Sequence, residues 1–433
     1  APGGRYCQRP QATRLAGERL AGPAPPGLAL VRVVQRASGS VRAAHSGASL
    51  KHLHVAEGDL HRRLLPFVAF QGAVSTLIGF GGLLVFVQDG ALATVHYAVS
   101  LLTATVIAIT VPYLLGRWMP MQVRLVVRLC FAIPAALLWW ADGRPVLLAV
   151  ACGGFLGASW SARLWLELSL LQDAQRDAYA TRMTVWTVLS SLLATLLVSA
   201  ALSVAHEAAF AVYASYALIA ALAVFLAPRA LPSVPPMRLR DPASVLRQPA
   251  YVQSLPLYFL ESGLMGVGMV INASGAVQAL GRASHYGWAV SAATVVGALS
   301  LYAVRTRRHG GNRVRWMGVA CLGMVAGQSL LAASVWLPLL YVPHVLLLAC
   351  AQPFWQASEQ VLNQRALDLH GDLADRIVVR EWTLWLFRCT ALLAFWWLVQ
   401  GWSATQQLVL GVALMALATV LEWMLARRWL YAT

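Results

Sequence analysis

The sequence predicts an all-α membrane protein in which twelve transmembrane helices form two pseudo-symmetric six-helix bundles. Hydrophobic residues make up 59% of the 433 residues and charged residues only 12%, and the mean hydropathy is +0.64. A soluble domain of this length would carry more charge on its surface. Apolar runs of about 20 residues, the length of a membrane-crossing helix, recur along the chain. Because the backbone must satisfy its own hydrogen bonds in hydrocarbon, these runs are expected to be helices.

Two matches between distant segments predict that the membrane unit is duplicated. The run 65–71, Leu-Pro-Phe-Val-Ala-Phe-Gln, opens the first apolar segment, and the run 255–261, Leu-Pro-Leu-Tyr-Phe-Leu-Glu, opens a later one. A second pair, at 177–182 and 375–380, begins with Asp and ends with Arg in both copies. The two pairs occur in the same order at nearly the same separation, as a tandem repeat would place them.

The apolar runs divide six and six about a polar segment. They are expected at 64–87, 92–115, 123–141, 145–171, 182–204 and 208–227, and then at 252–278, 284–304, 315–334, 336–363, 381–400 and 404–426. The predicted domains are therefore a six-helix bundle at 64–227, a linker at 228–251 and a second bundle at 252–433. The linker contains six prolines, which prevent a continuous helix: Pro228, Pro232, Pro235, Pro236, Pro242 and Pro249.

Residues 1–63 differ from the rest of the chain in being rich in Arg, Ala, Gly and Pro. Low hydrophobicity and high charge predict a disordered basic tail in the cytosol. An arginine-rich targeting segment and a gene start placed too far upstream are the alternatives. We find no hydrophobic core of a secretory signal in this segment.

Arginine placement predicts the orientation of the helices. Almost all arginines between the runs fall on one side, among them Arg117, Arg124, Arg176, Arg229, Arg240, Arg315, Arg365, Arg376 and Arg427, whereas Arg144 and Arg282 fall on the other. Loops rich in positive charge stay in the cytosol, so both termini are expected there, in the inner membrane of a bacterium. The same clustering explains the net charge of +16 without nucleic acid as a partner.

Six plus six helices with a basic cytosolic linker resemble the major facilitator superfamily of secondary transporters. That family carries Gly-x-x-x-Asp-x-x-Gly-Arg between its second and third helices. The matching loop here, 116–124, keeps Gly116 and Arg124 and lacks the Asp, as does the equivalent loop at 305–313. The resemblance implies that helices 1, 4, 7 and 10 line a central cavity, that helices 2, 5, 8 and 11 flank it, and that a small solute crosses by alternating access.

Charged residues within the runs are the first candidates for the transport pathway. A lone charge at the centre of a membrane helix costs about 2.5–3.5 kcal/mol or more, so such groups should pair or face water. The candidates are Arg163, Glu167, Glu261, Glu359 and Arg388. On the helix numbering above, all five fall on helices 4, 7, 10 and 11.

Spacing and depth suggest roles for these candidates. Arg163 and Glu167 share a helix face, which predicts an ion pair. Burial raises the pKa of a carboxyl group and a nearby arginine lowers it, so Glu261 and Glu359 are candidate proton carriers. Arg388 is the expected partner of Glu359 or of an anionic solute. The alternative for each is a structural group held by hydrogen bonds.

Neutral polar residues extend the predicted pathway. Gln71 occupies the position of Glu261 in the first repeat, and Gln356 lies one turn before Glu359. Such side chains are more often glue between helices than ligands. Met265 and Met269, one turn apart, would suit copper(I), but methionine is a common packing residue, and we expect no metal and no cofactor.

The sequence does not favour catalysis. It contains no Walker phosphate-binding loop, no Gly-x-Ser-x-Gly and no His-Glu-x-x-His, so we expect no enzyme activity and no catalytic residue. A monomeric transporter of a small solute and of protons, embedded in lipid, is the main prediction. A membrane protein that assists assembly of another complex is the alternative.

Overall fold

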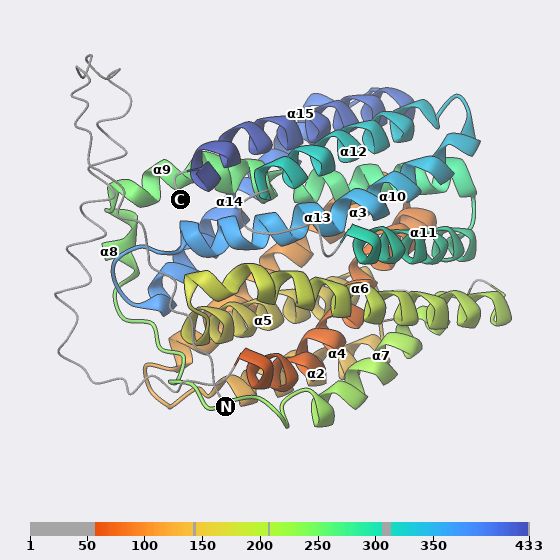
Figure 1. Cartoon of the computed structure of the whole chain (residues 1–433). Coiled ribbons are helices and arrows are strands. Elements are labelled where there is room, and N and C mark those ends of the chain that lie inside the picture. The colour runs from red at the N-terminus through yellow and green to blue at the C-terminus, as the bar shows by residue number, and fades with distance from the viewer. Residues whose placement is uncertain (1–56, 142–143, 207, 305–312, 432–433) are drawn as a thin grey trace, which may run out of the picture. The chain divides into compact units, whose positions relative to one another are not determined.

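The computed structural model describes residues 57–141, 144–206, 208–304 and 313–431. Within these ranges the regular elements are helices, apart from one isolated β-bridge between Met121 and Met237. Figure 1 shows the longer helices lying alongside one another. The prediction of an all-α fold is confirmed.

The first half of the described chain contains six helices, and one of them combines parts of two predicted spans. They are α2 (Glu57–Ser75), α3 (Leu77–Leu115), α4 (Val123–Leu138), α5 (Pro145–Leu170), α6 (Asp173–Val204) and α7 (Ala209–Leu226). Gly90 interrupts α3 with a φ of 82°, which favours glycine because it has no side chain. The break separates the end of the first predicted span from the start of the second.

The linker and the second half follow. A short helix, α8 (Pro242–Leu246), lies in the linker. The remaining elements are α9 (Pro249–Tyr258), a π-helical turn η1 (Phe259–Gly263), α10 (Met265–Leu280), α11 (Ala283–Val304), α12 (Arg313–Ala333), a 3₁₀ turn at Pro338–Leu340, α13 (Tyr341–Ala366), α14 (Leu373–Leu398) and α15 (Ala404–Tyr431).

Eight helical stretches of the described residues are long and apolar enough to cross a membrane. One of them, Leu60–Leu115, has 56 residues, which at 1.5 Å per residue would extend about 84 Å. A hydrocarbon core is only about 30 Å thick, so this stretch must cross twice, with its turn at Gly90. Helices α4, α11 and α14 are not among the eight, and the full count of twelve therefore stays a prediction.

Helix contacts repeat between the two halves. In the first half α2 contacts α6, α3 contacts α5, and α4 contacts both α5 and α7. In the second half η1 contacts α14, α11 contacts α13, and α12 contacts both α13 and α15. Numbered in chain order, each half pairs its first helix with its fifth, its second with its fourth, and its third with its fourth and sixth. This repetition supports the predicted six-and-six division, whose boundaries remain a prediction.

Glycines allow α3 and α5 to pack closely. A Cβ atom on Gly153 would lie 2.3 Å from the Leu101 carbonyl oxygen, and one on Gly157 would lie 2.1 Å from that of Thr105. Small residues let membrane helices approach until their backbones touch. These contacts hold the second and fourth helices of the first half together.

The predicted tail is shorter than expected. Helix α2 begins at Glu57, so the helical part of the chain starts seven residues before the predicted boundary at 64. Residues 57–63 continue the helix because Leu60 and Leu64 are buried on one face, 3% and 1% exposed. The rest of the predicted tail and most of the loop at 305–313 lie outside the described residues.

Both copies of the Leu-Pro motif precede an interrupted helix. Pro66 lies inside α2, which ends at Ser75 just before α3 begins, and Pro256 lies inside α9, which passes through η1 into α10. Proline removes a backbone donor and disturbs the helix around it. Discontinuous helices of this kind commonly surround binding sites in transporters.

Candidate functional site

A cavity of about 590 Å³ lies between the interrupted helices of the two halves. Residues 75–83, at the junction of α2 and α3, form one wall. The opposite walls come from η1, α10, α11, α12, α13 and α15. The volume is in the range of small-molecule sites.

The helices around this cavity differ in part from those that the family resemblance implied. The first, seventh and tenth predicted helices contribute as expected, but α5, the fourth, supplies no lining residue. Met324 and Gln328 of α12 and Thr419 and Glu422 of α15 line the cavity instead. The cavity therefore extends into the second half, to two helices that the resemblance places neither in the lining nor beside it.

Glu261 is the charged residue among the predicted site residues that line the cavity. Its Oε1 atom accepts a hydrogen bond from Arg380 Nη2 at 2.8 Å, and its side chain is only 8% exposed. Its Oε2 atom is buried and has no hydrogen-bond partner. One carboxyl oxygen is thus fixed by an arginine and the other is unpaired beside the cavity.

Arg380 organises the polar groups around Glu261. It also donates to Asn363 Oδ1 at 2.9 Å, forms an ion pair with Glu381, and places its guanidinium 5.5 Å from the centre of the Tyr258 ring. Because Arg380 lies just before the predicted span at 381–400, its position predicts a flanking charge at the end of a helix. In the structure it is 5% exposed and holds two carboxylates.

The expected pair of Glu359 and Arg388 does not form. Arg388 donates from Nε to Ser262 Oγ at 2.9 Å instead, because Ser262 lies beside Glu261 on the turn that faces α14. Glu359 still interacts electrostatically with both arginines and with Glu261. It belongs to the cluster without an ion pair among the described residues.

A corresponding cluster forms in the first half. The predicted pair is confirmed, since Arg163 Nε lies 2.7 Å from Glu167 Oε1. Arg163 Nη1 donates to Gln71 Oε1 at 3.2 Å, and Gln71 Nε2 donates to Ser159 Oγ at 3.3 Å. Gln71 and Glu261, at equivalent positions of the repeat, therefore both accept a hydrogen bond from an arginine.

Glu167 also connects the two halves. Gln360 of α13 donates to both of its carboxylate oxygens at 3.0 Å, and Gln364 donates to Oε2 at 2.9 Å. Nearby, Arg176 of α6 pairs with Asp368, with an N–O distance of 2.9 Å. These contacts lie at the ends of α5 and α13 that are next to the linker, which we call the linker side.

The linker itself is bonded to both halves. The carboxylate of Asp375, at the start of α14, accepts hydrogen bonds from the backbone amides of Arg240 at 2.8 Å and Asp241 at 2.9 Å. In the first half, Arg117 donates to the Leu239 and Arg240 carbonyls. Gly116 makes room for the crossing, because a Cβ atom there would lie 1.9 Å from the Met237 carbonyl oxygen. The loop that lacks the family's acidic residue thus holds the linker.

Of the seven predicted pathway residues, the structure brings two to the cavity wall, Glu261 and Gln356. Gln71, Arg163 and Glu167 form the cluster of the first half. Glu359 interacts electrostatically with Glu261, and Arg388 donates to the neighbouring Ser262. Glu422 was missed, although it interrupts the last apolar run as Glu261 interrupts the seventh, and the same criterion would have found it. It is 3% exposed, and its Oε1 atom has no hydrogen-bond partner.

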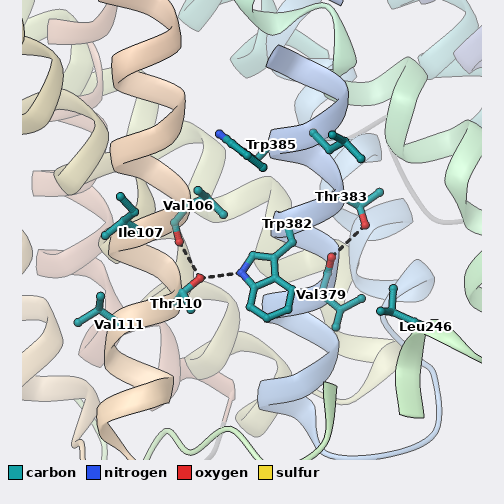
Figure 2. Close-up of a pocket in the computed structure, with 10 residues that line it drawn as sticks. Val106, Ile107, Thr110, Val111, Leu246, Val379, Trp382, Thr383 and Trp385 are labelled. Atoms are coloured by element: carbon teal, nitrogen blue, oxygen red, sulfur yellow. Dashed lines mark hydrogen bonds between the residues drawn. The ribbon is translucent and has the colours of Figure 1, made fainter. Parts of the chain in front are cut away.

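A second cavity, also about 590 Å³, lies between α3 and α14 and is almost entirely apolar. Figure 2 shows Trp382 reaching from α14 toward α3, where its indole nitrogen donates to Thr110 Oγ1 at 2.8 Å. Apolar residues of α3, α8 and α14 form most of the rest of the wall, among them Val106, Ile107, Leu246 and Leu386. This cavity contains no charged lining residue among those described. It could contact an apolar group, but no described lining residue has an ionisable side chain to bind a charged solute or a proton.

The fold and the cavity define a membrane protein with the architecture of major facilitator transporters. A point mutant of the nucleoside transporter NupG superposes with a TM-score of 0.55 at 15% identity, covering 86% of this chain and 99% of that one. The xylose transporter XylE from E. coli gives 0.56 at 12% identity, with coverages of 85% and 97%. A bacterial homologue of the iron transporter ferroportin gives 0.53 at 14% identity, with coverages of 86% and 98%.

These similarities are structural. No model of a protein family matches the sequence, and a search of curated proteins also gives no match. At such identities the shared feature is the fold, and the prediction of that fold from the helix count and the linker is confirmed.

Proposed function

We propose that this chain is a secondary active transporter that moves a small solute across a membrane by alternating access, coupled to protons. The observation that carries the proposal is the unpaired Oε2 atom of Glu261, buried in the wall of a cavity that both halves enclose. A buried carboxyl group without a second partner is costly when ionised. It gains from binding a proton or a solute, and so it can exchange one for the other.

Alternating access requires contacts between the halves that can break. The contacts on the linker side are a small number of polar interactions. Glu167 accepts hydrogen bonds from Gln360 and Gln364, and Arg176 pairs with Asp368. Rocking of one half against the other would separate them and open the cavity toward the linker. The state described here, in which these bonds are made, is closed on that side.

The placement of arginines supports an orientation for this cycle. The linker side carries most of the arginines between helices, which assigns it to the cytosol together with both termini. We place the protein in the inner membrane of a bacterium, acting as a monomer. We assign proton coupling to Glu261, which lines the cavity, and to Glu359, which interacts with it electrostatically.

The coupling is tested by replacing each carboxyl group with its neutral isostere. Proteoliposomes containing the wild type, Glu261→Gln or Glu359→Gln would be screened with solutes for substrate-driven proton flux. We expect flux in the wild type and loss of coupling in at least one variant. Unchanged coupling in both variants would rule out these carriers. Asp89→Asn, which removes an exposed carboxylate far from the cluster, is the matched control.

Alternating access is tested without knowledge of the solute. A cysteine at Asn272, which lines the cavity, would be labelled from each face of the membrane in a background without the six native cysteines. A transporter should react from both faces. Labelling from one face only would favour the non-transporting assembly protein.

A further inference from the structure

The charged residues of the cavity between the halves all have the same sign. Among the described residues that line it, the charged ones are Glu261 and Glu422, and no arginine, lysine or histidine joins them. Both carboxyl groups are more than nine-tenths buried, and each has one oxygen without a hydrogen-bond partner, Oε2 of Glu261 and Oε1 of Glu422. Each carboxyl group of the lining therefore has one buried oxygen without a partner, and no described lining residue is positively charged.

Among the described residues, arginine compensates Glu261 but not Glu422, and Arg380 divides its charge between Glu261 and Glu381. The hydrogen bonds of Arg380 go to Glu261 Oε1, Glu381 and Asn363, and those of Arg388 go to Ser262. The groups that interact electrostatically with Glu422 are Glu359 and Glu261, which are both acidic. These two acidic groups repel Glu422 when it is ionised, so a positive charge in the cavity would stabilise it.

The rest of the lining suits an apolar body. Four methionines from three helices face the cavity, Met265, Met269, Met324 and Met415, together with the rings of Tyr286 and Trp355. Thioether side chains adapt to varied shapes, and aromatic ring faces attract cations. The neutral amides of Asn272, Gln328, Gln352 and Gln356 add polarity without charge.

We propose that the solute is a monovalent organic cation with an apolar body, held by Glu261 and Glu422. This inference rests on the proposed function and specifies its substrate class. In the empty site the excess carboxyl charge is removed by bound protons, and an incoming cation replaces a proton, which leaves to water. A bound anion would add charge of the same sign as the wall, so anions are excluded from the site.

Binding to the purified full-length protein in detergent tests the charge rule directly. Tetraphenylphosphonium and tetraphenylborate have nearly the same shape and opposite charge, so comparing them on the wild type needs no variant. We expect saturable binding of the cation, with release of protons to an indicator dye, and no binding of the anion. Equal binding of both ions would overturn the proposal.

Variants then locate the site. Glu422→Gln and Glu261→Gln should each weaken tetraphenylphosphonium binding at least tenfold, whereas Glu422→Asp, which keeps the charge, should retain most of it. The control Asp89→Asn should bind as the wild type does. Wild-type affinity in both Gln variants would overturn the assignment.

The outcome separates this inference from the proposed function. If the cation fails to bind while another solute drives proton flux, the substrate class is wrong and the transporter function remains. If the cation binds with the expected variant pattern while the cysteine at Asn272 reacts from one face only, the site is correct and the transport proposal fails.

Discussion

The Glu167 carboxylate of α5 accepts a hydrogen bond from the Gln364 side-chain amide of α13 at 2.9 Å, across 197 residues of sequence. Glu167 is bound to Arg163 within its own half, so its position is set before the second half approaches. The glutamines contribute neutral donors, which can leave the carboxylate without stranding a charge. This arrangement fits a contact that forms and breaks repeatedly.

Removing these donors should open the linker side. Hydrogen bonds to a charged group contribute about 1.5–3 kcal/mol each, and every 1.4 kcal/mol corresponds to about a tenfold change in an equilibrium. We expect Gln360→Ala with Gln364→Ala to raise the open population at least tenfold. Spin labels at Trp118 and His370, on exposed turns of the two halves, would report this as a longer distance.

The control for this experiment lies on the same helix. Gln352 lines the cavity and not the contact with Glu167, so Gln352→Ala should leave the distance distribution unchanged. An unchanged distribution in the double variant would mean that Glu167 does not hold the halves together.

Asp375 should hold the linker far more firmly than Asp372 does. Asp375 is 2% exposed and accepts two backbone amides, whereas Asp372 pairs with Arg240 through side chains that are 40% and 67% exposed. Exposed ion pairs contribute little. Asp375→Ala should therefore speed hydrogen exchange at the Arg240 and Asp241 amides by at least tenfold, and Asp372→Ala should change it little. Similar hydrogen-exchange rates at these amides in the two variants would contradict the stronger role given to Asp375.

The sequence predicted interactions within a helix better than those between helices. The pair of Arg163 and Glu167 follows from helical spacing alone, and the apolar runs located most helices. The partner of Glu261 could not be found in this way, because it depends on how α14 is rotated against η1. That rotation turns the Arg380 side chain inward. Because Arg380 lies at the edge of an apolar run, its sequence position alone predicts a charge outside the membrane.

The repeat located equivalent positions but not equivalent partners. Gln71 and Glu261 both meet an arginine, yet Arg163 comes from α5 and Arg380 from α14. The two halves share a similar backbone arrangement. The hydrogen-bond partner of a side chain depends instead on which residues the neighbouring helices place beside it. The extension of the cavity to α12 and α15 likewise depends on packing between helices, which hydropathy does not report.

Gly157 should be far less tolerant of substitution than Gly154. A Cβ atom on Gly157 would lie 2.1 Å from the Thr105 carbonyl oxygen, whereas one on Gly154 would have no heavy atom within 4 Å. Overpacking a tight contact costs about 1–3 kcal/mol. Thermal unfolding in detergent should show a clear loss of stability in Gly157→Ala and none in Gly154→Ala. Equal melting temperatures would mean that α3 and α5 are farther apart than described.

Arg380 should contribute more to stability than Arg388, although both lie on the same face of α14. Removing one partner of a buried ion pair costs about 3–5 kcal/mol, because the remaining charge is left uncompensated. Arg380→Met strands Glu261 and Glu381, whereas Arg388→Met removes a donor from the neutral Ser262. Thermal unfolding should therefore show a distinctly larger loss in the Arg380 variant.

A double-mutant cycle assigns that loss to its cause. In the Arg380→Met background, Glu261→Gln removes the stranded charge and should recover part of the lost stability. In the wild type the same substitution should be destabilising, because it weakens the bond to Arg380. The sign of the effect thus reverses between the two backgrounds. The same cycle built on Arg388 should show no reversal, and a reversal there would mean that Arg388 also compensates the Glu261 carboxylate.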